Sequence, residues 1–307
     1  MIKRTVTGIV MAGVLFLILW LTIFSHFVFD GFVFLVGVVA SYEIYTAVTG
    51  KTLFKKKMSE EQPIETPEQE TKRYNISVVS VGLAVVATYP LCYFFGYLGL
   101  FFSFIIAFIV AFIIFIFDEK KTFNDFCVNV FAIVYPSVLL GIVYILNLQY
   151  GMIPVMLALG ISMVSDTAAY FIGASLGKKK IFPKISPKKT YAGCIGGVLG
   201  GALGGIIVYL LFELAGFPTY IKFTFTGLFD GKKWLAILLY AIVGAIMAVF
   251  SEIGDLAASR VKRQMGIKDY GKILGSHGGI MDRIDSILFS VAGMAIIMEI
   301  IRAAGKI

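Results

Sequence analysis

The residues best suited to chemistry gather between Ser251 and Ser286, where acidic, basic and glycine residues interrupt a mostly apolar sequence. No glycine or proline occurs in the ten residues after Asp255, so this part is predicted to be helical. On that helix Glu252, Asp255, Ser259 and Lys262 share one face, because their spacing follows the helical repeat. Two carboxylates one turn apart on one face suit a hard cation that prefers oxygen ligands.

The second half of this stretch is rich in glycine and is not predicted to be regular helix. Paired glycines let backbone N–H groups close on a phosphate. Basic side chains there would add charge-assisted donors: Lys268, Lys272, His277 and Arg283. Asp282 and Asp285 follow, one turn apart, where the next apolar segment begins. Acids for a metal beside donors for phosphate are what phosphoryl and nucleotidyl transfer require. Charge alone is equally consistent with a loop that only sets orientation in a membrane.

The order of these residues resembles the signature of the phosphatidate cytidylyltransferase family. The specified positions of that signature are all filled here: Ser259, Lys262, Arg263, Lys268, Asp269, His277, Gly278, Gly279, Asp282, Arg283 and Asp285. A match of this length is far more specific than a short glycine motif.

An acidic residue also lies within the apolar segment 153–176. Asp166 is predicted to be buried there, with no basic neighbour in sequence, and an intramembrane acid usually faces a protein or water-filled cavity. A structural hydrogen bond is the alternative. The spacing of Asp166, Ala169, Tyr170 and Gly173 again resembles the cytidylyltransferases.

A dense cationic loop, residues 177–191, follows this segment. Its six lysines would attract a triphosphate or an anionic lipid head group. Ser186, Lys189 and Thr190, with the glycines that follow, resemble a second motif of the family. Ala192 departs from the family pattern, which often has an acidic or amide residue at this position.

The resemblance, together with the chemistry of the side chains, predicts a role for each site residue. We expect Asp255 and Asp282 to bind Mg²⁺ or another divalent cation, with Glu252, Asp166 and Asp285 in or near its coordination shell. Lys188, Lys189 and His277 are expected to hold triphosphate oxygens, and His277 to assist the departure of pyrophosphate. The remaining nucleotide-binding positions are predicted to be Ser186, Thr190, Lys268, Gly278, Gly279 and Arg283.

The composition indicates an all-α integral membrane protein. The chain has 307 residues, of which 59% are hydrophobic and only 15% charged. Soluble domains average about 45–50% apolar and about 25% charged. The formal net charge of +8 does not indicate nucleic acid as a partner, because most of it lies in short loops between apolar segments.

About nine transmembrane helices are predicted. Eight lie near residues 7–24, 27–48, 76–96, 99–117, 124–147, 153–176, 234–255 and 286–303, and the seventh in chain order contains the glycines between 193 and 205. With a cytoplasmic N-terminus, the C-terminus lies outside and both motif loops face the cytoplasm. The outer segments then hold only five of the lysines and arginines: Lys222, Lys232, Lys233, Arg302 and Lys306. This bias fits the positive-inside rule.

The chain is predicted to divide near residue 150. Residues 1–150 would hold about five helices and a polar linker at 50–74, and residues 151–307 would form the catalytic region. Glu43, in the second span, is expected to extend toward the nearby interface. Glycines repeat at four-residue intervals between 193 and 205, which indicates close helix–helix contact and not a nucleotide loop.

The resemblance implies a membrane enzyme that joins CTP and phosphatidate into CDP-diacylglycerol and pyrophosphate. It also implies a multi-pass protein of a cell membrane, the bacterial inner membrane being favoured, and it leaves a homodimer open. A related transferase or kinase acting on an isoprenoid lipid is the alternative within this class. An ion-coupled transporter is the alternative from another class, because buried acids and a glycine-rich helix also suit a cation pathway.

Overall fold

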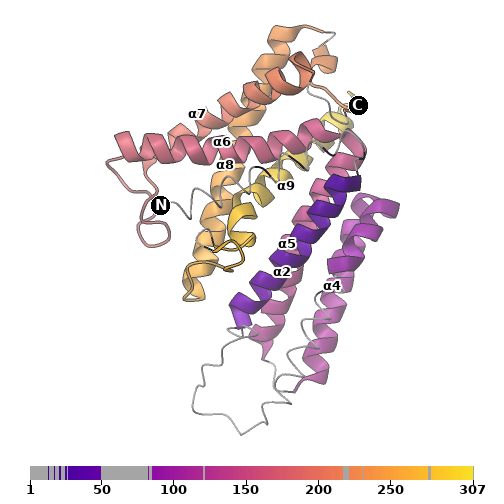
Figure 1. The fold of residues 1–307 in the computed structure, drawn as a ribbon. Coiled ribbons are helices and arrows are strands. Elements are labelled where there is room, and N and C mark those ends of the chain that lie inside the picture. Colours follow the sequence, from indigo (N-terminus) through magenta and orange to yellow (C-terminus); the bar gives the residue numbers. More distant parts are fainter. Residues whose placement is uncertain are drawn as a thin grey trace. The chain divides into compact units, whose positions relative to one another are not determined.

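The computed structural model of the chain consists of helices, as the composition predicted (Figure 1). It describes residues 27–49, 85–119, 122–216, 221–229, 231–275 and 278–306, with residues 13, 17, 21, 25 and 82. Within these ranges there is no β-strand, and only two isolated bridges occur, Gly151–Ile221 and Lys180–Thr190. The all-α class is therefore confirmed.

Seven of the described helices are long and apolar enough to cross a membrane, so the protein is a multi-pass membrane protein. They are α2 (Phe27–Thr49), α4 (Tyr97–Phe117), α5 (Phe123–Tyr150), α6 (Met152–Leu176), α7 (Tyr191–Val208), α8 (Lys233–Gln264) and α9 (Met281–Ala303). Short helices follow α7 at Tyr209–Leu214 and Thr226–Phe229.

All seven helices coincide with predicted spans. The linker at 50–74 lies outside the described residues, and of the predicted span at 7–24 only residues 13, 17 and 21 are described. The predicted span at 76–96 is described in part, and there Val85–Phe95 forms a shorter apolar helix.

The chain forms two compact units. The N-terminal unit comprises Val33–Gly141 together with Asp269–Asp282, and so contains most of α2, all of α4 and the first part of α5 (Figure 1). Tyr89 donates a hydrogen bond to the Val33 carbonyl at 3.0 Å. The loop that precedes α9 thus belongs with the N-terminal helices, which the predicted division near residue 150 did not anticipate.

The C-terminal unit comprises Ile142–Lys268 and Arg283–Ile307, with Met1–Phe32. Its helix α7 packs on both α6 and α8 through glycine. A Cβ atom at Gly200 would overlap Ala168 of α6, and one at Gly205 would overlap the Tyr240 carbonyl of α8. Since side chains larger than hydrogen do not fit, the predicted close helix contact is confirmed.

Helix α8 is unusually long for a membrane span. Its 32 residues extend about 48 Å at about 1.5 Å per residue, whereas the hydrocarbon core is about 30 Å thick. The residues from Glu252 onward form its charged C-terminal part. The helix can therefore cross the membrane and still carry this charged part beyond the hydrocarbon.

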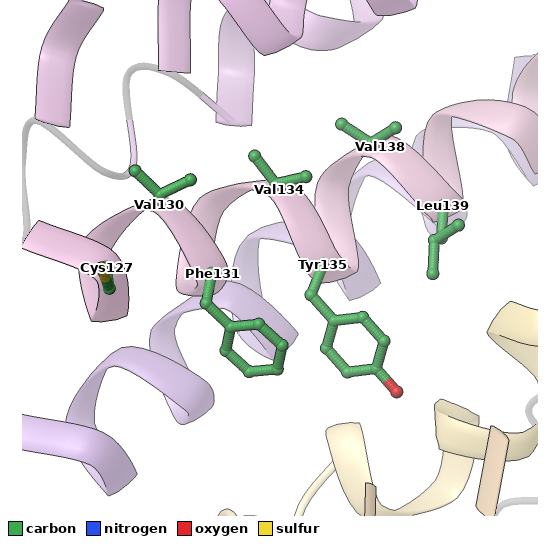
Figure 2. A pocket seen from close by; sticks show the side chains of 7 residues that line it. All are labelled: Cys127, Val130, Phe131, Val134, Tyr135, Val138 and Leu139. Atoms are coloured by element: carbon green, nitrogen blue, oxygen red, sulfur yellow. The ribbon is translucent and has the colours of Figure 1, made fainter. Parts of the chain in front are cut away.

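Figure 2 shows an apolar groove of about 410 Å³ along α5, lined by side chains between Cys127 and Leu139. None of the predicted site residues lines it. An apolar groove on a membrane helix suits hydrocarbon contact better than polar chemistry, so we do not assign it to the active site.

Candidate active site

The cationic loop between α6 and α7 is folded back on itself by backbone hydrogen bonds. Lys189 accepts one from the Ile181 N–H at 3.2 Å, and Tyr191 donates one to the Lys179 carbonyl at 3.1 Å. The loop ends at Thr190, whose hydroxyl accepts from the Gly193 N–H at 3.1 Å and so caps the start of α7. The backbone of the loop is thus fixed where it meets α7.

Two glycines, Gly173 of α6 and Gly177 directly after its end, allow this cap to form. A Cβ atom at Gly177 would overlap the Thr190 hydroxyl, and one at Gly173 would lie 3.1 Å from it. The motif positions Gly173, Gly177, Thr190 and Gly193 therefore serve the junction of α6, loop and α7. The lysines of the loop stay exposed, except for the half-buried Lys189: Lys178, Lys179, Lys180, Lys184 and Lys188.

Lys189 connects the cationic loop to the acidic part of α8. Its ammonium group lies 2.9 Å from Asp255 Oδ2 and donates to the Glu252 carbonyl at 3.2 Å. The pair is only partly exposed, with 18% of the Lys189 side chain and 33% of the Asp255 side chain accessible. The structure thus brings together two residues that the sequence placed in different motifs.

Glu252 is buried one turn before Asp255, and its Oε1 atom has no hydrogen-bond partner among the described residues. A Cβ atom at Gly197 of α7 would overlap this oxygen. A buried, unpaired carboxylate oxygen is costly unless a proton or a cation compensates it. The glycine at 197 therefore makes room for a charged group and not only for helix packing.

Asp166 of α6 accepts a hydrogen bond from the Ser286 hydroxyl of α9 at 3.2 Å. It also lies close enough to Asp255, Lys189 and Glu252 for their charges to interact. The residue is exposed, so the prediction that it is buried is wrong. Asp166 thus lies with other polar and charged groups where α6 meets α9.

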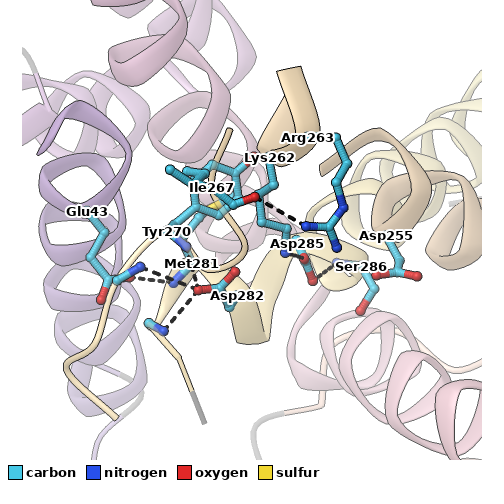
Figure 3. A network of polar contacts seen from close by, with 12 residues as sticks. Glu43, Asp255, Lys262, Arg263, Ile267, Tyr270, Met281, Asp282, Asp285 and Ser286 are labelled. Atoms are coloured by element: carbon cyan, nitrogen blue, oxygen red, sulfur yellow. Dashed lines mark hydrogen bonds and ion pairs between the residues drawn. The ribbon is translucent and has the colours of Figure 1, made fainter. Parts of the chain in front are cut away.

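Asp285 of α9 forms a buried ion pair with Lys262 of α8, 3.3 Å apart (Figure 3). Only 10% of the Lys262 side chain and 8% of the Asp285 side chain are exposed. The helices approach closely here because Gly254 has no side chain, and a Cβ atom there would lie 2.8 Å from the Asp285 carbonyl oxygen. The pair joins the charged ends of α8 and α9.

Within the C-terminal unit, four carboxylates lie near two lysines that pair with them. Among the described residues, the ammonium groups found to interact with Asp166, Glu252, Asp255 and Asp285 are those of Lys189 and Lys262. Together with the unpaired Glu252 oxygen, this excess of negative charge fits a bound cation. In the part of the chain that the structure describes, no three acidic, histidine or cysteine side chains are already arranged as metal ligands.

Asp282, the other predicted metal ligand, organises a loop in the N-terminal unit. Its Oδ2 atom accepts backbone hydrogen bonds from Tyr270 at 2.8 Å, Gly279 at 3.0 Å and Gly271 at 3.4 Å (Figure 3). Three backbone donors on one carboxylate oxygen give this residue a structural function, whether or not it also binds a metal.

Glu43 is a residue whose place the sequence did not reveal. It is only 2% exposed, so the expectation that it extends to the interface is wrong. Its Oε2 atom accepts from the Met281 N–H at 2.9 Å, at the start of α9 (Figure 3). An acidic residue within an apolar span was the only sequence signal for this contact.

The other predicted residues lie on the loops that border these helices, except Arg283, which lies in the first turn of α9. Lys268 and Arg283 are exposed, Gly278 is buried, and Ser186 is half-buried in the turn that precedes Lys189. His277 lies outside the described residues.

A sequence profile of the Cytidylyltransferase family matches residues 2–301. This range covers nearly the whole chain. The chain belongs to the cytidylyltransferase family. The family that the signature resembled is thereby confirmed.

Relatives from several bacteria share part of the sequence. The phosphatidate cytidylyltransferase of Bacillus subtilis (strain 168) is 33% identical over 141 residues, 46% of this chain and 45% of the relative. That of Staphylococcus saprophyticus is 29% identical over 172 residues, 56% of this chain and 58% of the relative. That of Mycobacterium tuberculosis (strain H37Rv) is 32% identical over 139 residues, which are 45% of this chain and 36% of the relative. The chain thus spans about half the length of the curated relatives it matches.

Proposed function

We propose that this protein is a phosphatidate cytidylyltransferase, which converts CTP and phosphatidate into CDP-diacylglycerol and pyrophosphate. The observation that carries the proposal is the contact of Lys189 with Asp255, because it joins a cationic loop to an acidic helix end in a chain of this family. The names of the bacterial relatives point to the same reaction.

The proposed reaction needs no nucleophilic side chain. A phosphate oxygen of phosphatidate attacks the α-phosphorus of CTP, and the bond from that phosphorus to the oxygen bridging to the β-phosphate breaks. Pyrophosphate leaves with the electron pair. Since both reactants are anions, the difficulty is their mutual repulsion, and catalysis consists of positioning and charge neutralisation.

Lysines of the 177–191 loop are suited to the triphosphate. Lys188 is exposed, and Lys189 can exchange the Asp255 carboxylate for a phosphate oxygen. On the acidic side, we propose that Asp255, Glu252 and Asp166 hold a divalent cation, Mg²⁺ being favoured, and that Asp282 contributes as the sequence predicts. The cation would supply positive charge to phosphate oxygens.

The deciding experiment uses the purified full chain in detergent with phosphatidate, magnesium and CTP labelled in parallel at the α- or the γ-phosphate. Cytidylyl transfer moves the α-label into lipid and the γ-label into pyrophosphate. A CTP-dependent lipid kinase would instead move the γ-label into lipid. An isoprenoid phosphate, offered in place of phosphatidate, tests the other lipid class. An ion-coupled transporter would label no lipid, and that outcome would overturn the proposal.

We predict that Lys188→Ala raises the apparent KM for CTP about tenfold while changing the KM for lipid little, because one charge-assisted contact to phosphate is lost. Added salt should weaken CTP binding further. Lys184→Ala is the matched control, since Lys184 is exposed on the same loop but lies outside the motif. If only the KM for lipid rises, the loop binds the lipid head group and not the nucleotide.

We further propose nine membrane spans, a cytoplasmic N-terminus and an active site that faces the cytoplasm of a bacterial cell. The seven candidate spans support this count when the predicted spans at 7–24 and 76–96 are added. The distribution of lysine and arginine supports the orientation.

A reporter fused after Ile307 should therefore report the outer compartment, and one inserted between residues 58 and 70 should report the cytoplasm. Both fusions are scored for enzyme activity, so that only folded protein is counted. A cytoplasmic reporter signal from the Ile307 fusion would show that the number of spans is even.

A further inference from the structure

We propose that Glu43 of α2 is a positioning residue, which holds the signature loop 269–281 in its folded shape. Its importance for catalysis rests on the proposed function, but its contacts with the loop do not. Glu43 and this loop belong to the same compact unit, although they are more than 200 residues apart in sequence.

Glu43 supplies an acceptor for the start of α9. The first N–H groups of a helix have no partner within the helix, and a carboxylate is well placed there because the helix dipole is positive at this end. The Met281 N–H donates to Glu43 Oε2 at 2.9 Å, and Glu43 is 2% exposed. The carboxylate of one helix thus caps another.

The loop also closes directly on this carboxylate. Cβ atoms at Gly271 and Gly279 would overlap the Glu43 side chain, and the three nearest atoms at each position all belong to Glu43. Two glycines, one near each end of the loop, therefore make room for the same side chain. This explains in physical terms why a loop with these contacts needs glycine there.

Glu43 and Asp282 divide the backbone donors of the loop ends between them. Asp282 accepts from the N–H groups of residues 270, 271 and 279, and Glu43 accepts from that of Met281. The tip is held by its own turns, such as the hydrogen bond from Leu274 N–H to the Gly278 carbonyl at 3.0 Å. Removal of Glu43 would therefore loosen the loop where it meets α9 and take away the side chain on which Gly271 and Gly279 pack, while the hydrogen bonds to Asp282 remain.

The first test is hydrogen exchange of a peptide covering residues 269–282, compared in wild type, Glu43→Gln and Glu43→Ala. Glutamine keeps one acceptor oxygen but loses the charge, so we expect exchange to quicken about tenfold in Glu43→Ala and less in Glu43→Gln. Asp30→Ala is the matched control. Asp30 is a buried acid at the other end of α2, where it accepts from Asn147 Nδ2 at 2.8 Å.

A positioning role also predicts a kinetic pattern that general destabilisation does not. The catalytic efficiency of CDP-lipid formation, kcat/KM for CTP, should fall about tenfold or more in Glu43→Ala and be partly restored in Glu43→Gln. The melting temperature of Glu43→Ala should nevertheless match that of Asp30→Ala. Equal turnover in Glu43→Ala and Asp30→Ala would overturn the positioning role. Loop exchange as slow as in wild type would overturn the contact itself.

The second test couples Glu43 to Gly271. Gly271→Ala should reduce turnover about tenfold in the wild-type background, but cost little more in a Glu43→Ala background, where the overlapping side chain is gone. Gly275→Ala is the control, because Gly275 has a positive φ of 58° and no atom near its Cβ position, so its effect should add to that of Glu43→Ala. Additive effects for Gly271 would contradict the proposal.

These results separate the two proposals. A wild-type protein that makes no CDP-lipid would refute the proposed function, and hydrogen exchange would still test the contact of Glu43 with the loop. An active wild type whose loop exchanges no faster without Glu43 would refute the inference alone. If Glu43→Ala does not fold, the exchange of Glu43→Gln decides.

Discussion

Asp255→Asn is expected to lower CDP-lipid formation about 10³-fold, which corresponds to about 4 kcal/mol of transition-state stabilisation. Asparagine keeps the size of the side chain and removes the charge that a cation would need. The structural cost should be small, because the ion pair with Lys189 is partly exposed and such pairs contribute about 0–1 kcal/mol. The measurement is a magnesium titration of wild type and variant, with melting temperature recorded in parallel.

Asp282→Asn should lose activity to a similar degree, both because a proposed metal ligand is lost and because the loop loses a charged acceptor. Loop exchange separates these two causes. The Asp282 carboxylate accepts three backbone hydrogen bonds in the loop, so a change there should also quicken loop exchange, whereas Asp255→Asn should not. A double variant that loses little more than either single one would show that the two acids act as a unit. Full wild-type activity in chelator would refute the metal assignment.

Lys262→Met is expected to destabilise the protein by about 3–5 kcal/mol, because it leaves the Asp285 carboxylate buried without its partner. Methionine fills most of the space of the lysine side chain, so the lost charge and not a cavity causes the effect. The measurement is thermal or denaturant unfolding of the purified protein in detergent. We expect the double variant Lys262→Met/Asp285→Asn to recover most of the lost stability but not the activity.

Lys189→Met is the matched control for this experiment. Lys189 also pairs with an aspartate, but 33% of the Asp255 side chain is exposed against 8% of the Asp285 side chain. Its loss should cost less than about 1 kcal/mol of stability. Equal destabilisation by the two lysine variants would show that burial of the Asp285 pair does not matter.

The helices could be predicted from the sequence because hydropathy and length suffice to locate a membrane span. The seven candidate spans coincide with predicted ones, and the packing of α7 followed from glycine spacing alone. Family membership was also predictable, since the signature around His277 and Asp282 fixes many positions in one order. These features depend on residues that are close together in the sequence, so they can be predicted without knowledge of the tertiary structure.

The contacts that the sequence could not reveal join distant segments. Lys189 and Asp255 are 66 residues apart, and no sequence rule pairs a lysine of one loop with an acid of another helix. Glu43 was expected at the interface because a lone acid near a helix end usually extends there. The structure instead buries it under two glycines that lie beyond residue 270. Asp166 was expected to be buried because the sequence does not show which groups surround it in the fold, yet the residue is exposed.

The length of α8 has a consequence for the effective concentration of the lipid substrate. A helix about 48 Å long is long enough to carry its acidic groups past the hydrocarbon core, to the depth of the phospholipid phosphates. Under the proposed function, phosphatidate then arrives by lateral diffusion and never leaves the bilayer. The effective concentration of phosphatidate is its mole fraction in the membrane surface, whereas the concentration of CTP is expressed per volume of solution. At a given CTP concentration, the reaction rate per enzyme molecule should therefore depend on the mole fraction of phosphatidate in the membrane and not on the total amount of membrane.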